Sequence, residues 1–130
     1  MQRVLVIDDE AVICGIFEDV LTIGNRFVVG IGSSGTELRA LLDAHDDVVA
    51  IVCDQTLVGE TGLGIHATIE SVLRARSIAF LLVHGRGQEL RESLPDGYFK
   101  ERNIVEVLKP IPHIMDIVGI IDREVGRLRS

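Results

Sequence analysis

Four charged residues from three distant parts of the sequence each follow an apolar stretch at the point where that stretch ends. They are Asp8, Asp9, Asp54 and Lys109. If the apolar stretches are neighbouring strands of one sheet, these side chains converge at one edge. Three carboxylates suit a hard divalent cation, for which Mg²⁺ is the usual candidate, and the ammonium can neutralise an anion beside it. The pattern therefore predicts a combined cation and anion site.

The same acidic residues have a simpler alternative role. Carboxylates that follow a strand often only cap the next helix, and taken alone this is the better interpretation of Asp9 and Glu10. The combination of three strand ends with complementary charge favours the functional interpretation.

The strand before Asp54 is expected to lie in the middle of a sheet. Residues 49–53 are apolar throughout. A strand without a polar face is typical of a parallel sheet that helices cover on both sides. Ligands of such sheets bind in the crevice outside the carboxyl ends of the strands. The predicted strands begin near Arg3, Phe27, Val48, Ile78 and Ile104.

Helical patterns follow each of these strands. Gly24 ends the first helix, Ser34 and Glu37 form a capping box before the second, and the third begins near Gly62. A short polar helix is expected over residues 88–94. The third helix is expected to bury Ile65, Ile69, Val72 and Leu73.

The last predicted helix carries more apolar residues than one buried face needs. Its main stripe comprises Ile114, Ile117, Val118, Ile121, Val125 and Leu128. Ile111, Met115 and Ile120 lie outside this stripe, and all three cannot face the core together with it. The surplus predicts either deeper packing of a wide stripe or a surface for a partner protein or a second copy of the chain.

Strand and helix alternate five times, which predicts a single domain over residues 1–130. The expected fold class is α/β, a doubly wound parallel sheet with right-handed crossovers and helices on both faces. A hydrophobic share of 47% supports a full core. Cys14 and Cys53 both lie in apolar surroundings, so we expect two buried free thiols and no disulfide.

Charge and targeting patterns restrict the partners and the location. The formal net charge is −7, which opposes unspecific binding to nucleic acid or to anionic membranes. A protein partner is therefore the expectation. No signal peptide and no apolar stretch of membrane-spanning length is visible, which predicts a cytoplasmic protein.

These residues together resemble the receiver domain of two-component response regulators, over nearly the whole chain. The resemblance lies in VLVIDDE near the start, in the isolated acid of IVCDQTLVGETGLGI and in VLKP near the end. It implies the flavodoxin-like strand order 2-1-3-4-5 for the five-stranded sheet. Gly62 and Leu63 match the Gly-Leu pair that opens the third helix of the family, and Lys109 matches a lysine before a proline, here Pro110, that is typically joined by a cis bond.

The resemblance also implies roles for the predicted site. Asp54 would be the phosphoacceptor, taking a phosphoryl group from a phosphohistidine on a sensor histidine kinase or phosphotransfer protein. Asp9, Asp54 and the backbone carbonyl of Thr56 would hold Mg²⁺, with Asp8 acting through water, and Lys109 would pair with a phosphoryl oxygen. Such a domain is not an enzyme for other substrates, although it assists its own phosphorylation and dephosphorylation. It would signal by contact with a downstream protein.

Three residues depart from the family pattern. His84 stands where the family usually has the switch threonine or serine, and Glu106 where it usually has the tyrosine or phenylalanine that rotates on activation. Val58 replaces a common proline in the loop after the acceptor. An imidazole can still donate a hydrogen bond to a phosphoryl oxygen, but the usual coupled motion should be absent.

Two alternative functions follow from the same sequence. The altered switch positions would suit a receiver-like interaction module without a working phospho-switch. In addition, Gly30, Gly32 and Gly35 form a GxGxxG motif between a strand and a helix, and Asp54 follows it by nineteen residues, as in dinucleotide-binding domains. That motif normally follows the first strand, so we rank a dinucleotide site below the other two functions.

Overall fold

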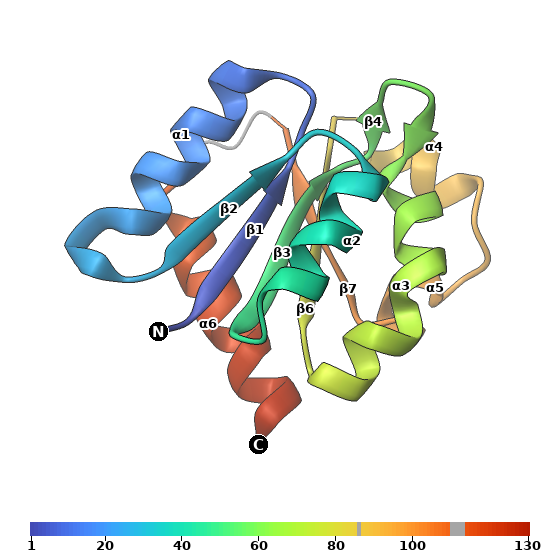
Figure 1. Cartoon of the computed structure of the whole chain (residues 1–130). Coiled ribbons are helices and arrows are strands. Elements are labelled where there is room, and N and C mark those ends of the chain that lie inside the picture. Colours follow the sequence, from blue (N-terminus) through green and yellow to red (C-terminus); the bar gives the residue numbers. More distant parts are fainter. Residues whose placement is uncertain (86, 110–113) are drawn as a thin grey trace.

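A five-stranded parallel sheet forms the centre of the protein (Figure 1). The structure, a computed structural model, describes residues 1–85, 87–109 and 114–130. Its strands lie in the order β2-β1-β3-β6-β7, which is the predicted order 2-1-3-4-5 counted over this sheet. The strands are β1 (Arg3–Ile7), β2 (Val28–Gly32), β3 (Val48–Asp54), β6 (Ala79–His84) and β7 (Ile104–Leu108). The predicted fold class is therefore confirmed.

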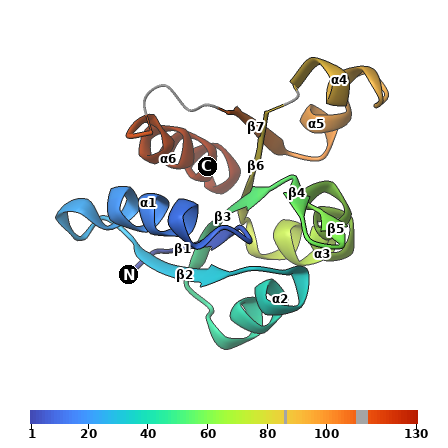
Figure 2. The same ribbon diagram turned by 90° about the horizontal axis from the view of Figure 1, so that it is seen from above.

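Helices cover both faces of this sheet, as Figure 2 shows from above. On one face α1 (Ala11–Thr22) and α6 (Asp116–Arg129) enclose one apolar core, and on the other α2 (Gly35–Ala44) and α3 (Gly62–Arg76) enclose a second. Central strand β3 is buried along its whole length, because both faces are covered.

The region after β6 differs from the prediction. The expected short helix is present as α4 (Gly87–Glu92), but a second short helix that was not predicted, α5 (Tyr98–Glu101), follows it. The side chains of Leu90, Tyr98 and Phe99 pack against the second core. A small antiparallel hairpin, β4 (Thr56–Leu57) with β5 (Glu60–Thr61), was also not predicted. Gly59 has a φ of 75° in its turn, a conformation that glycine adopts without strain.

The ends of the first two helices follow the predicted signals. After α1 the chain makes a short 3₁₀ turn, Ile23–Asn25, in which Gly24 has a φ of 63°. At the start of α2 the Ser34 hydroxyl accepts a hydrogen bond from the Glu37 amide. The Glu37 carboxylate completes this cap at Ser33, where it accepts hydrogen bonds from the backbone amide and the hydroxyl.

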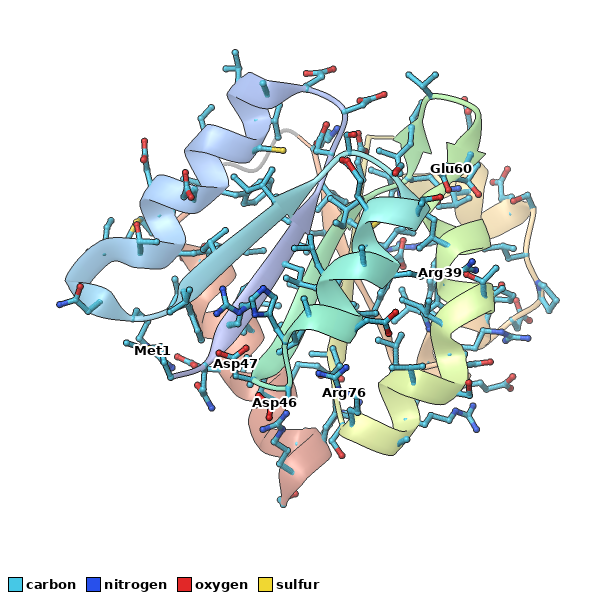
Figure 3. The ribbon with its side chains drawn as sticks, viewed as in Figure 1. Met1, Arg39, Asp46, Asp47, Glu60 and Arg76 are labelled. Atoms are coloured by element: carbon cyan, nitrogen blue, oxygen red, sulfur yellow. The ribbon has the colours of Figure 1, made fainter. Side chains whose placement is uncertain are left out.

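Two side chains of neighbouring elements bind the opposite ends of α2, and Figure 3 labels both. At the N-terminus the Glu60 carboxylate accepts a hydrogen bond of 3.1 Å from the Gly35 amide. At the C-terminus the Arg76 guanidinium donates to the carbonyl oxygens of Leu42 and His45, at 3.0 and 2.6 Å. Negative charge at the positive end of a helix and positive charge at its negative end both stabilise it. These contacts fix α2 to α3 and to the β4–β5 hairpin.

The buried face of α3 differs from the prediction at one position. Ile65, Ile69 and Leu73 are buried as expected, but Val72 is 37% exposed. His66 is buried instead, with 2% of its surface exposed, and its ring meets Phe80 edge to face at a centroid distance of 4.9 Å. Hydrophobic periodicity does not predict a polar residue on the core side of a helix, so the sequence pattern did not indicate this position.

The last helix packs more of its apolar residues than expected. Ile117 and Ile121 are buried, and Ile120, which was predicted to lie outside the stripe, packs in part against the first core. Met115 remains 52% exposed. Ile111 and the proposed cis bond before Pro110 lie outside the described residues.

Both predictions on cysteine are confirmed, since Cys14 and Cys53 are free and buried. Among the described helices, none combines the length and the hydrophobicity that crossing a lipid bilayer requires.

We expect His66 to make folding sensitive to mild acid. Burial lowers the pKa of His66 below its usual 6.5. The unfolded chain therefore binds a proton at His66 at a higher pH than the folded chain does, so stability is lost as the pH falls below about 6.5. The loss can reach about 1.4 kcal/mol for each pH unit between the two pKa values. Urea unfolding at several pH values between 8 and 5 measures it, because that range spans the ordinary histidine pKa of about 6.5.

The matched variant is His66→Leu, which keeps an apolar contact with Phe80 and removes the titrating group. Its free energy of unfolding should fall less steeply than that of the parent between pH 7 and pH 5, a window around the histidine pKa of about 6.5. Parallel pH profiles would show that His66 does not contribute.

Candidate functional site

The sheet brings the predicted site residues to one edge. Asp54 at the end of β3 lies beside Val83 of β6, and His84 of β6 lies beside Leu108 of β7. On the other side of β3, Cys53 is the partner of Ile7 in β1, after which Asp8 and Asp9 follow. Because all strands are parallel, these carboxyl ends meet at the switch point between β1 and β3, where α/β sheets bind their ligands.

The predicted acidic cluster is present. Carboxylate oxygens of Asp8, Asp9 and Asp54 all lie within 4.8 Å of one another. Two oxygens bound to a single Mg²⁺ lie at most about 4.2 Å apart, because each Mg–O bond is about 2.1 Å long. A small side-chain rotation or one bridging water closes that difference, and a set of carboxylate oxygens is the donor chemistry that Mg²⁺ prefers. The residues present therefore fit this ion.

The three carboxylates differ in their surroundings. Asp8 and Asp54 are 4% and 5% exposed, whereas Asp9 is exposed to solvent. Burial raises the pKa of Asp8 above its usual 3.8, and the charge of Asp54 adds to the effect, although a 2.9 Å hydrogen bond from the Glu10 amide opposes it. A bound cation would relieve the repulsion that the ionised carboxylates exert on each other.

Lys109 supplies the predicted positive charge. Its ammonium donates to Asp54 Oδ1 at 3.2 Å, and the Thr56 amide lies 3.4 Å from the same oxygen. The backbone amide of Lys109 also donates to the carbonyl of His84 at 2.8 Å, which continues the pairing of β6 and β7 past the last strand residue. The ammonium therefore approaches the Asp54 carboxylate from the end of β7.

The start of α3 is fixed directly against the acceptor strand. A Cβ atom on Gly62 would stand 2.7 Å from the carbonyl oxygen of Asp54 and 2.6 Å from the Leu82 side chain, so only glycine fits here. The Gly62 amide donates to the carbonyl of Gln55 at 3.0 Å, and the Leu63 amide to the Gln55 side chain at 2.9 Å. The close approach explains physically why a glycine stands at position 62.

Beside Asp54 lies a chain of polar contacts that the sequence analysis missed. His84 Nε2 lies 2.9 Å from a Glu106 carboxylate oxygen, and the Arg91 guanidinium of α4 binds the two oxygens of that carboxylate at 2.9 and 3.2 Å. Glu106 is paired with Leu82, two residues before His84, so both side chains lie on the same face of the sheet. Both departures from the family pattern had been identified singly, but the sequence does not give the register that joins them.

A cavity of about 490 Å³ opens next to these groups. It lies between the strand ends and α4, and His84 borders it together with Asp54 and Lys109. The remaining lining residues are Gln55, Thr56, Gly85, Glu89, Leu90 and Ser93.

The glycine motif of β2 has a structural explanation. Cβ atoms on Gly30 and Gly35 would stand 2.8 Å from the side chains of Leu5 and Glu60, respectively, so these glycines permit close packing. The Gly35 amide, which a pyrophosphate would need, already binds Glu60, and β2 is an edge strand away from the switch point. This arrangement favours packing over dinucleotide binding.

Solved structures with this fold include response regulator receiver domains. A response regulator receiver domain protein from Clostridium thermocellum is similar with a TM-score of 0.81 and 24% sequence identity, over 99% of this chain and 98% of that chain. A receiver domain protein from Methanospirillum hungatei gives a TM-score of 0.78 at 16% identity, over 99% and 97% of the two chains. A chemotaxis protein from Vibrio cholerae gives 0.77 at 16% identity, over 95% and 98%.

The sequence matches no protein-family model and no curated protein. The predicted likeness to receiver domains is thus confirmed at the level of the fold.

We expect Asp8→Asn to stabilise the metal-free protein at neutral pH. The folded state holds the Asp8 proton more tightly than the unfolded state does, so stability is lost as the pH rises from 3.8 through the raised pKa of Asp8. Asparagine removes the charge and keeps the oxygen that accepts the Glu10 amide. For a gain on the order of 1 kcal/mol, the melting temperature should rise by roughly 2–4 °C.

Asp9→Asn is the matched control, because Asp9 belongs to the same cluster but is exposed. It should change the metal-free melting temperature less than Asp8→Asn does. A lower melting temperature for Asp8→Asn would contradict the expected repulsion.

Proposed function

We propose that the protein is a phosphoacceptor receiver domain of a two-component signalling system, spanning residues 1–130. One observation carries the proposal: the buried Asp54 carboxylate lies both within the acidic cluster and in contact with the Lys109 ammonium, at the switch point of the sheet. The receiver fold agrees with this function.

The arrangement suits phosphoryl transfer to a carboxylate. An Asp54 oxygen would attack phosphorus in line, and the bond from phosphorus to the nitrogen of a phosphohistidine, or to the oxygen of an acyl phosphate, would break. Lys109 would neutralise charge on the transferred group while remaining close to Asp54. Hydrolysis would later regenerate the carboxylate and release inorganic phosphate.

Mg²⁺ fits the proposed site as the cation that neutralises phosphoryl charge. Asp9, Asp54 and the backbone carbonyl of Thr56 would hold it, and Asp8 would contribute through water. The protein's own residues orient the acceptor: Gly62 fixes the strand end, and the Thr56 amide and Lys109 both face Asp54 Oδ1.

The proposed partners are proteins. A sensor histidine kinase or phosphotransfer protein would supply the phosphoryl group, and a downstream protein in the cytoplasm would read the phosphorylated state. The protein would not act as an enzyme on other substrates.

One observation favours a second function, an interaction module without a working phospho-switch. His84 and Glu106 stand at the two positions where receivers usually carry their switch residues, and here they are hydrogen-bonded to each other, with Arg91 also bound to Glu106. If this group is rigid, phosphorylation would not change the surface.

We expect Asp54 to be phosphorylated by acetyl phosphate in a reaction that needs Mg²⁺. Mass spectrometry of the intact protein should show the mass of one phosphoryl group, and Asp54→Asn should remove it. NMR titration with Mg²⁺ alone should shift resonances near Asp54 in the parent but not in Asp9→Asn. Asp43→Asn, on the exposed surface of α2, serves as the matched control and should behave like the parent. Absence of modification, or modification that persists in Asp54→Asn, would contradict the phosphoacceptor function.

We expect weak self-association through α6, because Met115 is 52% exposed at its start, beside the partly buried Ile120. Sedimentation equilibrium should show a mass that rises with concentration, and Met115→Lys should abolish the rise. Val58→Lys, at an 84% exposed position of the β4–β5 turn, is the control that should leave it intact. A monomeric mass at all concentrations would exclude the homodimer and leave only a different protein as the partner of this surface.

A further inference from the structure

One nitrogen of His84 stands out among the buried polar atoms. The side chain of His84 is 4% exposed, and its Nδ1 atom is buried without a hydrogen-bond partner. It is the only such side-chain nitrogen or oxygen in residues 1–85, 89–109 and 114–130. Because a buried polar atom without a partner costs free energy, its retention points to a partner that is present only in another state of the protein.

The other nitrogen of the ring determines where the hydrogen of His84 lies. Nε2 is 2.9 Å from the Glu106 carboxylate. An ionised carboxylate only accepts hydrogen bonds, so Nε2 must carry the hydrogen and donate it. In the neutral ring Nδ1 then carries a lone pair and no hydrogen, so it cannot donate a hydrogen bond to a phosphoryl oxygen.

The charges around the ring are already balanced without His84. Arg91 binds both oxygens of Glu106, and Lys109 contacts Asp54. Neither anion needs an imidazolium as its counter-charge. A neutral imidazole ring has one hydrogen, which it can donate either to Glu106 or to a group on Asp54.

A cavity of about 490 Å³ at the strand ends is bordered by His84, Asp54 and Lys109 together. A group attached to Asp54 would occupy this cavity. Nδ1 itself is buried, so the imidazole ring has to turn toward the cavity for Nδ1 to reach that group. The strand ends that carry Asp54 and His84 are neighbours in the sheet.

We propose that His84 exchanges its single hydrogen between Glu106 and the phosphoryl group on Asp54. This inference rests on the proposed function, because it needs a phosphoryl group at Asp54. In the unmodified protein Nε2–H donates to Glu106. In the phosphorylated protein Nδ1–H donates to a phosphoryl oxygen, so Nε2 loses its hydrogen and the contact with Glu106 is released.

The exchange gives α4 a way to sense the acceptor site. Glu106 links the end of β6 to α4 through His84 on one side and Arg91 on the other. Loss of the His84 bond leaves Glu106 bound to Arg91 alone. Position 106 would thus transmit the signal by a changed hydrogen bond, where an aromatic residue would do so by rotation.

The tautomer can be measured directly by ¹⁵N NMR of the parent protein with labelled histidine, at a fixed pH of about 8, where an ordinary histidine is neutral. Beryllofluoride with Mg²⁺ is the probe that imitates the phosphoryl group. We expect Nε2–H without the probe and Nδ1–H with it, together with a shift of the Arg91 Nε resonance. An unprotonated Nδ1 in the complex, or a ring with hydrogens on both nitrogens, would overturn the exchange.

A variant tests the role of Glu106 independently. In Glu106→Gln the side-chain amide can donate to Nε2, so the Nδ1–H tautomer no longer loses a bond. The variant should bind beryllofluoride about five-fold more tightly, because the net contribution of one hydrogen bond to the binding free energy corresponds to about that ratio of affinities. Glu101→Gln, at an exposed carboxylate of α5, is the matched control and should bind like the parent. Equal or weaker binding by Glu106→Gln would overturn the competition.

These outcomes separate the inference from the function on which it rests. If acetyl phosphate does not modify Asp54 in the parent and beryllofluoride does not bind there, the phosphoacceptor function is contradicted. The proposed hydrogen exchange of His84 is then contradicted as well. If Asp54 is modified but the His84 tautomer does not change, the function stands and the exchange fails.

Discussion

The ion pair between Lys109 and Asp54 is the contact on which the functional edge of the protein depends. Its two partners are 55 residues apart and come from the ends of β3 and β7, with β6 between them. A carboxylate that is 5% exposed beside another buried carboxylate is costly unless a positive charge or a bound cation compensates it. The ammonium provides that compensation, which lets three acidic residues remain together without unfolding the edge.

Packing and hydrogen bonds from several elements hold the end of β3 in place. The whole of β3 is buried between two apolar cores, so the position of Asp54 is fixed by packing on both faces of the sheet. Gly62 brings the start of α3 against the carbonyl of Asp54, and Glu60 and Arg76 fix α2 next to it. Side chains at the end of a tightly packed strand move little, so the Asp54 carboxylate is held in one position.

The group formed by His84, Glu106 and Arg91 gives the other half of the edge a different character. Receiver domains place a small hydroxyl residue and an aromatic residue at the first two positions, whereas here a buried imidazole is hydrogen-bonded to a carboxylate that a guanidinium also binds. Such a polar network has discrete hydrogen-bonding states, because each proton has one position at a time. The chain therefore combines the fold of receiver domains with a polar network at two positions where the family usually carries a hydroxyl and an aromatic residue.

The sequence by itself determined the five strands of the central sheet, the class of fold and the charged residues that gather at its carboxyl edge. The uninterrupted apolar run before Asp54 predicted a strand covered on both faces, and the charge at three strand ends predicted the edge where these residues meet. It did not determine the face on which His66 lies, the second short helix α5 or the contact of His84 with Glu106. The physical reason is that local periodicity records whether a residue is apolar, whereas these features depend on strand register and on contacts between distant segments. Only the folded sheet, by pairing Leu82 with Glu106, decided that the two unusual residues would meet.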